Sequence, residues 1–464
     1  MKVQEQMFKE LDEKTIFNQA KEYAFEYADE IDDRPVFPTE KAIQDLDVFN
    51  EVMPKEVGSP DEIIKLLHQY GSPATVAQTG GRYFGFVNGG AVPVSIATKW
   101  LSDFWDQNAG LYLISPINSK LEVICEQWLK EIFNLPKETV AGFVSGTSTA
   151  NLCGLVAGRY RLLKNQGWDV NENGLIGAPP IKIVAHTQVH GAIKKALAII
   201  GFGKNNITWV DSDKEGRILL EKIPEIDSNT MIILQAGNAN SGAFDPFEKI
   251  CKKANEVGAW VHVDGAFGLW AAATDTLSHL TKGMELASSW AVDGHKTLNT
   301  PYDSGIVLCK DGPALVSALQ ATGEYIIFSE NKDSMLYTPE MSKRARAIEL
   351  WATMKYLGKK GINEMVTGFY HHAKQFEKDM KSNGFRIMNE VVFNQIMIAC
   401  DSDEETKAML THLQNSGECW CGGSTWHGEA VVRVSICSWA TTEKDIQRTV
   451  QAFVTARKQV LEFN

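Results

Sequence analysis

Two charged residues, one at the end of a short apolar run and one before the next such run, could carry out chemistry together. Asp264 ends the run Trp260–Val263, and Lys296 stands shortly before the next apolar run, Ile306–Leu308. A lysine amine can hold an aldehyde cofactor as a Schiff base, and a carboxylate can pair with a protonated pyridine nitrogen. This order of an acid at one strand end and a lysine before the next strand indicates a site for pyridoxal 5′-phosphate (PLP).

The residues around the acid also suit a flat ring. In a strand, His262, Asp264 and Ala266 share one face, and the small Ala266 lets a ring approach closely. Taken separately, Asp264 and Gly265 form a common turn pair, and a His-Lys pair is typical of a solvated loop. The order of the two motifs favours the PLP interpretation over both alternatives.

A Gly/Ser/Thr turn provides a second signal. The apolar run 141–144 leads into Ser145-Gly-Thr147-Ser148-Thr and then into a helical pattern. Free backbone N–H groups at a helix start, with hydroxyls beside them, predict a phosphate-binding turn, although Ser/Thr caps without a ligand are common. The turn lacks the Gly-Lys-Ser/Thr of a Walker loop and the GxGxxG spacing of a dinucleotide site.

His190 is a candidate for a ring contact. It follows the apolar run Ile181–Ala185 and precedes the helical stretch Ala192–Ile200. An imidazole there can stack on the PLP ring or face water near the helix start. His186, four residues earlier, is the rival for the stacking position.

Composition excludes several classes of function. The formal net charge of −12 argues against nucleic-acid or polybasic membrane partners. No apolar run approaches the roughly 18 residues of a membrane span, and the acidic N-terminus is unlike a signal peptide, so we expect a cytoplasmic protein. Among eight scattered cysteines only Cys419 and Cys421 are close together, and we expect no metal site.

Strand-like and helical runs alternate after residue 140, which predicts an α/β fold with a mostly parallel central sheet covered on both faces. Ligands bind beyond the carboxyl ends of the strands in such sheets. The candidate residues Thr147, His190, Asn238, Asp264 and Lys296 all fall in those loops or at the helix starts. Residues 80–116, rich in glycine and aromatic residues, are expected to form loops lining a pocket.

The length of 464 residues predicts more than one domain. We expect an N-terminal helical arm over 1–80 that serves dimerisation, a large PLP-binding domain over 81–335 and a small α+β domain over 336–464. A long helix is predicted to start near Tyr337 and to carry Arg344 and Arg346.

In its motifs the sequence resembles the PLP-dependent group II amino-acid decarboxylases, relatives of the aromatic-amino-acid, glutamate and cysteine-sulfinate decarboxylases. The resemblance runs from about Val36 to the C-terminus. It includes, in order, RYFGFVNGG, WDQNAG, SGTSTAN, GNANSGAFDP, WVHVDGAFG, VDGHKTLNTPYDSG, TPEMSKRARAIELW and VVRVSICSWATTEKDI. It implies the PLP-dependent transferase-like fold (aspartate-aminotransferase, fold type I), a homodimer with shared active sites, and decarboxylation of an L-amino acid to the amine.

The resemblance also implies residue roles. Lys296 holds PLP, Asp264 faces the pyridine nitrogen, His190 stacks on the ring, and Ala266 lies under it. The phosphate contacts are Thr147, Ser148 and His295. Asn238 stands where relatives often carry a threonine that contacts the ring. Asn108 and Arg433 match substrate-carboxylate positions, but Arg433 also matches relatives whose substrates lack a side-chain carboxylate, so the amino acid stays open.

Two departures leave the reaction open as well. Thr297 follows the lysine where many relatives have tryptophan. A loop tyrosine usually protonates the substrate carbon in this family, and here Tyr325 and Tyr337 lie near the two ends of EYIIFSENKDSMLYTPEM, neither at the expected place. Transamination, carbon–carbon lysis and oxidative deamination are therefore the alternatives. A non-enzymatic homologue is disfavoured by the intact set of Lys296, Asp264 and His190.

Overall fold

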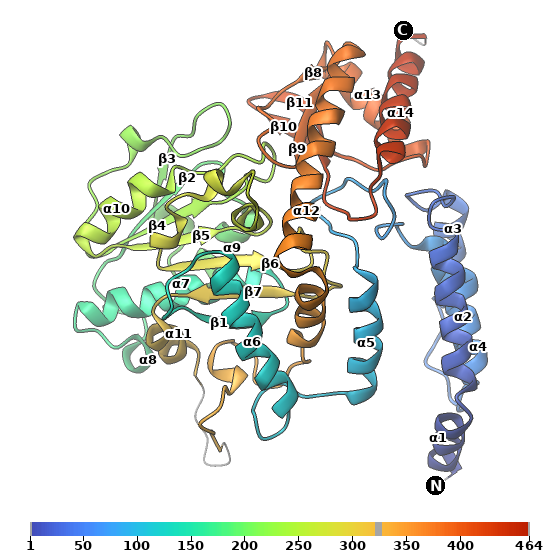
Figure 1. Ribbon diagram of the computed structural model, residues 1–464, viewed down its shortest axis with the longest axis horizontal. Coiled ribbons are helices and arrows are strands. Elements are labelled where there is room, and N and C mark those ends of the chain that lie inside the picture. The colour runs from blue at the N-terminus through green and yellow to red at the C-terminus, as the bar shows by residue number, and fades with distance from the viewer. Residues whose placement is uncertain (1, 321–326, 463–464) are drawn as a thin grey trace.

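A seven-stranded sheet forms the centre of the molecule (Figure 1), which the computed structural model describes over residues 2–320 and 327–462. Only β7 runs antiparallel to its neighbours, β1 and β6; the other pairings are parallel. This confirms the predicted α/β fold with a mostly parallel sheet. The strands, in sheet order, are β1 (Val140–Val144), β7 (Gly305–Cys309), β6 (Ser289–Asp293), β5 (Trp260–Asp264), β4 (Thr230–Gln235), β2 (Lys182–His186) and β3 (Ile207–Val210).

Helices bury both faces of this sheet, which explains why most residues of its strands are apolar. Along β2, Ile183 and Ala185 belong to one core and Val184 to the other, as alternating side chains require. Helices α7 (Thr147–Asn165), α9 (Gly191–Ile199) and α11 (Gly312–Leu319) contribute to the first core, and α6 (Pro116–Ile132), α10 (Phe247–Val257) and α12 (Ala347–Ser382) to the second. The short α8 (Val170–Asn173) follows α7.

The C-terminal part is built on an antiparallel four-stranded sheet. Its order is β10 (Gly422–Trp426), β11 (Glu429–Ser435), β9 (Gln395–Ala399) and β8 (Arg386–Ile387). Helices α13 (Asp403–Asn415) and α14 (Glu443–Glu462) share one buried core with it. The small α+β part is thus observed, while the boundaries placed at residues 80 and 335 stay predictions.

The predicted start of the long helix near Tyr337 is wrong. Helix α12 begins at Ala347 and continues to Ser382 with a kink at Gly358, whose φ is 55°. Arg344 and Arg346 precede it, because both guanidinium groups bond to the Asp303 carboxylate at 2.8 and 3.1 Å. This tertiary ion pair holds the segment outside the helix.

The interpretation of residues 80–116 as loops also needs correction. Helix α5 (Pro93–Trp105) lies within this stretch, with proline in its first turn, where the missing N–H costs nothing. Its large apolar side chains, among them Trp100, Leu101, Phe104 and Trp105, are exposed. The sequence did not predict α5 because many of its apolar residues do not pack into a core, and because the glycines on both sides of it favoured loops.

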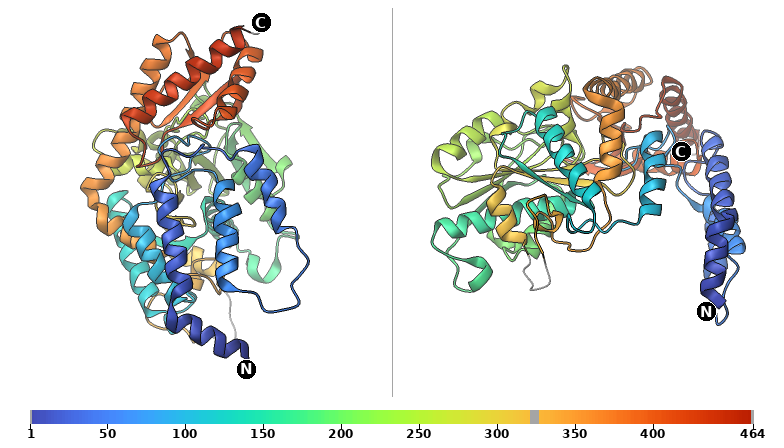
Figure 2. Two further views of the ribbon diagram at one scale, coloured as in Figure 1. Left: turned by 90° about the vertical axis from the view of Figure 1, so that its right-hand side faces the viewer. Right: turned by 60° about the horizontal axis from the view of Figure 1, so that its bottom comes forward.

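The predicted N-terminal arm consists of α1 (Lys2–Glu13), α2 (Thr15–Asp29), α3 (Glu40–Gln44) and α4 (Pro60–Leu66). It lies on the side of α5 away from the central sheet (Figure 1; Figure 2, right). Phe17 contacts Phe104 with ring centres 5.0 Å apart, and Phe25 contacts Trp100 at 5.9 Å. Within residues 2–320 and 327–462, every helix is too short or too polar to cross a membrane.

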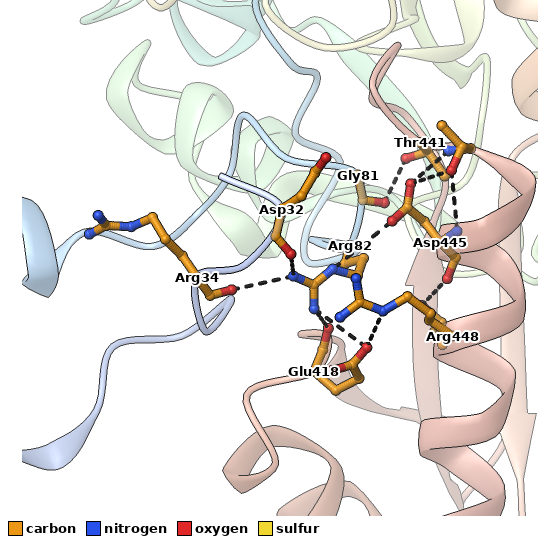
Figure 3. A network of polar contacts seen from close by, with 10 residues as sticks. Asp32, Arg34, Gly81, Arg82, Glu418, Thr441, Asp445 and Arg448 are labelled. Atoms are coloured by element: carbon orange, nitrogen blue, oxygen red, sulfur yellow. Dashed lines mark hydrogen bonds and ion pairs between the residues drawn. The ribbon is translucent and has the colours of Figure 1, made fainter. Parts of the chain in front are cut away.

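Arg82 joins the arm to the C-terminal part (Figure 3). Its side chain is 4% exposed, and its guanidinium donates to the carbonyls of Asp32 at 2.6 Å, Arg34 at 3.3 Å and Glu418. The Arg82 carbonyl accepts the N–H of Trp420 at 3.2 Å. These bonds hold residues 82–86 against the small sheet, next to the cavity described below.

Candidate active site

A cavity of about 900 Å³ opens where the carboxyl ends of β4, β5 and β6 meet the start of α7. Segment 86–88 and the small sheet complete its wall. This is where a mostly parallel sheet is expected to bind a ligand. The lining includes the predicted site residues Thr147, Ser148, His190, Asp264, Ala266, His295, Lys296 and Arg433.

Lys296 reaches the cavity from the turn that follows β6. Its Nζ lies 2.9 Å from Oδ2 of Asp293, and the other oxygen of Asp293 accepts the N–H of Thr147 at 2.7 Å. Asp293 thus joins the lysine to the start of α7. Sequence reasoning did not single out Asp293, although it stands in the Asp-Gly-His-Lys motif. Close packing supports this turn, because a Cβ at Gly89 would lie 2.1 Å from the Lys296 carbonyl.

Asp264 ends β5 and is 4% exposed. Burial raises the pKa of its carboxyl group, and His190, Lys296, the Ala266 N–H and Asn151 act against that rise. A buried carboxylate of this kind is stabilised by a cation in front of it. The protonated pyridine nitrogen of PLP supplies such a cation, so the acid fits the group.

The phosphate end has matching donors. Thr147 Oγ1 is buried and has no hydrogen-bond partner among the described residues, and Ser148 follows it in the first turn of α7, where N–H groups favour an anion. His295 lines the same region, stacked on Tyr302 with ring centres 4.3 Å apart, and burial lowers its pKa. An unpaired hydroxyl at a helix start fits a phosphate group.

His190, rather than its rival His186, lines the cavity. Its Nδ1 accepts the Ala192 N–H at 3.2 Å and so caps α9. His186 is instead fully buried at the end of β2, with Nε2 3.5 Å from Asp245 Oδ2. The helix start predicted after His190 is therefore observed, and it holds the imidazole at the cavity.

Two predicted site residues do not line the cavity. The Asn238 carbonyl oxygen Oδ1 accepts the N–H groups of Asn240 and Ser241 in its own loop. The Asn108 side chain bonds to Gly110 and Ser342. Within the described residues of one chain, neither amide faces the ligand space, and their assigned contacts stay predictions.

The candidate loop tyrosines also lie elsewhere. Tyr337 is half-buried and packs under the Lys332 ammonium group, 4.5 Å from its ring centre, and it does not line the cavity. Tyr325 lies outside the described residues. A tyrosine that sequence reasoning missed, Tyr302, does line the cavity. Its hydroxyl donates to Asn88 Oδ1 at 3.0 Å, and burial raises its pKa.

The outer wall combines aromatic rings with one cation. Trp420 stacks with both Tyr83 and Phe86, with ring centres 5.4 and 6.0 Å away. Arg433 donates to the carbonyls of Ala239 at 2.9 Å and Phe86 at 3.1 Å. Both acceptors are neutral, so these bonds leave the positive charge uncompensated, and burial lowers the pKa of the guanidinium. Such a group attracts a carboxylate.

Comparison with known proteins agrees with this geometry. The family model described as the pyridoxal-dependent decarboxylase conserved domain matches residues 47–399. The chain belongs to the pyridoxal-dependent decarboxylase family. It is accordingly a PLP-dependent carboxy-lyase, which confirms the resemblance, the cofactor and the enzyme class predicted from the sequence.

Members of this family that resemble the chain differ in substrate. The aromatic-L-amino-acid decarboxylase of Bacillus atrophaeus is 24% identical and covers 92% of each chain. The acidic amino acid decarboxylase GADL1 of Mus musculus is 25% identical, over 73% of this chain and 63% of that one. Among solved structures, Oryza sativa TDC with PLP and tryptamine has a TM-score of 0.88 at 21% identity, over 97% and 98% of the two chains.

Proposed function

We propose that the chain decarboxylates an L-amino acid to the corresponding amine, with PLP attached to Lys296 Nζ. The observation that supports this most is the convergence of Lys296, Asp264 and His190 with the start of α7 on one cavity. PLP, when bound, accepts the electron pair left behind by the departing carbon dioxide.

Each of the cavity residues would then have a separate role. Thr147, Ser148 and His295 would hold the phosphate, and His190 and Ala266 would hold the ring. Asp264 would keep a proton on the ring nitrogen. Lys296 Nζ would hold the cofactor and would carry a proton during the reaction. Arg433 and, from a second copy, Asn108 orient a substrate carboxylate.

The reaction is tested with a panel of aromatic, acidic and small L-amino acids, measured for both carbon dioxide and amine. We expect equal amounts of the two products from at least one amino acid. An aldehyde with ammonia, or a keto acid without carbon dioxide, would instead establish one of the alternative PLP reactions. The Lys296→Ala variant serves as the control for background release.

We also infer that the active unit is a homodimer. The arm and α5 lie along one side of the molecule (Figure 2, left). They carry many exposed apolar side chains, including Met7, Phe8, Leu11, Leu101 and Trp105. A soluble monomer rarely exposes such a patch. A second copy seated there would cover it and would bring its own Asn108, which follows α5, toward the site.

Replacing Leu101 and Trp105 with glutamate is expected to give monomers in sedimentation, because two carboxylates would be buried in the interface. Ile176→Glu is the matched control. Ile176 is 95% exposed and comes three residues after α8. Helix α8 lies on the side of the molecule away from the arm (Figure 1), so this variant should stay dimeric. A double variant that still sediments as a dimer would place the interface elsewhere.

A cytoplasmic location, without a nucleic-acid or membrane partner, is part of the same proposal. All eight cysteines are buried and free of disulfides, as is usual in a reducing compartment. Cell fractionation followed by immunodetection tests the location.

A further inference from the structure

A row of buried polar groups runs along β5 up to Asp264. Trp260, His262 and Asp264 are every second residue of the strand, so their side chains share one face. Helix α7 covers this face. Trp260 Nε1 lies 3.1 Å from Ser289 Oγ, Ser289 Oγ lies 2.8 Å from His262 Nδ1, and His262 Nε2 lies 2.9 Å from Asn151 Oδ1. Of this row only Asp264 lines the cavity; Trp260, Ser289, His262 and Asn151 are buried behind it.

The two ends of the row fix the direction of these hydrogen bonds. An indole N–H can only donate, so Trp260 donates to Ser289 Oγ. An amide oxygen can only accept, so His262 donates from Nε2 to Asn151 Oδ1, and its Nδ1 accepts the Ser289 hydroxyl proton. Burial lowers the pKa of His262 to about 3, so the ring is neutral and this single tautomer is kept.

The last donor in the row points to Asp264. With Oδ1 occupied, Asn151 has its NH₂ group left, and within residues 2–320 and 327–462 Nδ2 is buried without a hydrogen-bond partner. Asn151 lies under the strand face that carries both His262 and Asp264, and its side chain opposes the rise in the pKa of Asp264.

Packing holds the row in place. Asn151 and Gly154 lie three residues apart on the same side of α7. A Cβ at Gly154 would lie 2.6 Å from His262 Cε1 and Nδ1 and 3.2 Å from Ser289 Oγ. Glycine at this position therefore lets the imidazole lie against the helix that also begins the phosphate-binding turn.

We propose that His262 and Asn151 are positioning residues, which hold the Asp264 carboxylate ionised and aimed at the ring nitrogen of the cofactor. The inference rests on the proposed role of Asp264 and adds the groups through which the protein controls it. His262 fixes the amide of Asn151, and the amide supplies the N–H that faces the acid on the side away from the cavity.

The pH dependence follows with a definite sign. Burial raises the pKa of Asp264, and the opposing groups are His190 and Lys296 at the cavity, the Ala266 N–H, and Asn151 behind it. Removing the Asn151 donor leaves one opposing group fewer, so the pKa of Asp264 rises further. Activity that needs the ionised acid is then lost at a higher pH as the solution is acidified.

The test compares the PLP-loaded variants Asn151→Ala, His262→Phe and His262→Gln. For the first two we expect a kcat lower by about 10–100-fold, the range known for groups that orient metal ligands in the same indirect way, with little change in KM. The acid limb of the kcat profile and the pH titration of bound-PLP absorbance should both move to higher pH. Glutamine retains a donor near the Nε2 position, so His262→Gln should recover most of both properties.

Ser288→Ala is the matched control. Among the residues that the structure describes, Ser288 Oγ accepts a hydrogen bond from the Val261 N–H alone, so the pH profile of this variant should match that of the parent. If Asn151→Ala folds and binds PLP but shifts neither the absorbance titration nor the acid limb, the inference is wrong. If Asp264→Asn retains parental turnover, the proposed role of Asp264 itself is wrong. This result distinguishes a wrong role for Asp264 from a wrong positioning role for Asn151 and His262.

Discussion

Lys296→Ala is expected to lower turnover by about 10⁴-fold or more, since a positioned acid–base group alone contributes roughly 10²–10⁴-fold. The substitution removes the covalent attachment of PLP together with the amine that carries a proton. Steady-state decarboxylation under saturating PLP measures the loss. In the parent, borohydride reduction followed by peptide mapping should fix the cofactor on the peptide that contains Lys296.

Lys296→Arg tests whether the activity needs the reactive amine of Lys296 or only its positive charge. A guanidinium keeps the positive charge that faces Asp293 at 2.9 Å, but it stays protonated and cannot act as the amine nucleophile. We expect this variant to be as inactive as the alanine variant. An arginine variant with substantial turnover, or a reduced cofactor on another peptide, would contradict the assignment of Lys296.

Asp264→Asn is expected to lower turnover by about 10²–10⁴-fold. Removing one partner of a buried charge pair costs roughly 3–5 kcal/mol, and each ~1.4 kcal/mol corresponds to a tenfold change in rate. Asparagine keeps the shape of the side chain but cannot hold the proton on the ring nitrogen. PLP should still bind through the phosphate contacts and Lys296, which equilibrium dialysis and absorbance can check.

Asp245→Asn provides the comparison for this variant. Asp245 is another buried acid whose pKa is raised by burial, but it accepts the N–H groups of Ile218 and Gln235 and does not line the cavity. Its replacement should lower thermal stability and leave the spectrum of bound PLP unchanged. Near-normal turnover of Asp264→Asn would mean that another residue faces the pyridine nitrogen.

Local patterns predicted most of the central sheet and the cavity. The apolar runs Trp260–Val263 and Ile181–Ala185 coincide with β5 and β2 to within one residue, because strands buried on both faces consist mostly of apolar residues. The loops at their carboxyl ends then meet at one edge. Asp264, His190 and Lys296 could therefore be assigned to one place before any distance was known.

Features that depend on distant partners could not be predicted in this way. Arg344 and Arg346 continue a helical pattern in the sequence, yet the Asp303 carboxylate holds them outside α12. Asn238 occupies the expected loop, but its side chain closes that loop instead of facing the cavity. An ion pair and a local turn decided these outcomes, and neither leaves a periodic signal.

Contacts between residues far apart in the sequence also limit when parts of the molecule can fold during synthesis on a ribosome. Arg82 and the Glu418 carbonyl that it binds are 336 residues apart. At about 5–20 residues per second, roughly 17–67 s pass between their synthesis. During that time the guanidinium, the arm and the aromatic segment beside it lack the partner that buries them. A nascent chain of this protein is therefore expected to need chaperone protection until the last strands emerge.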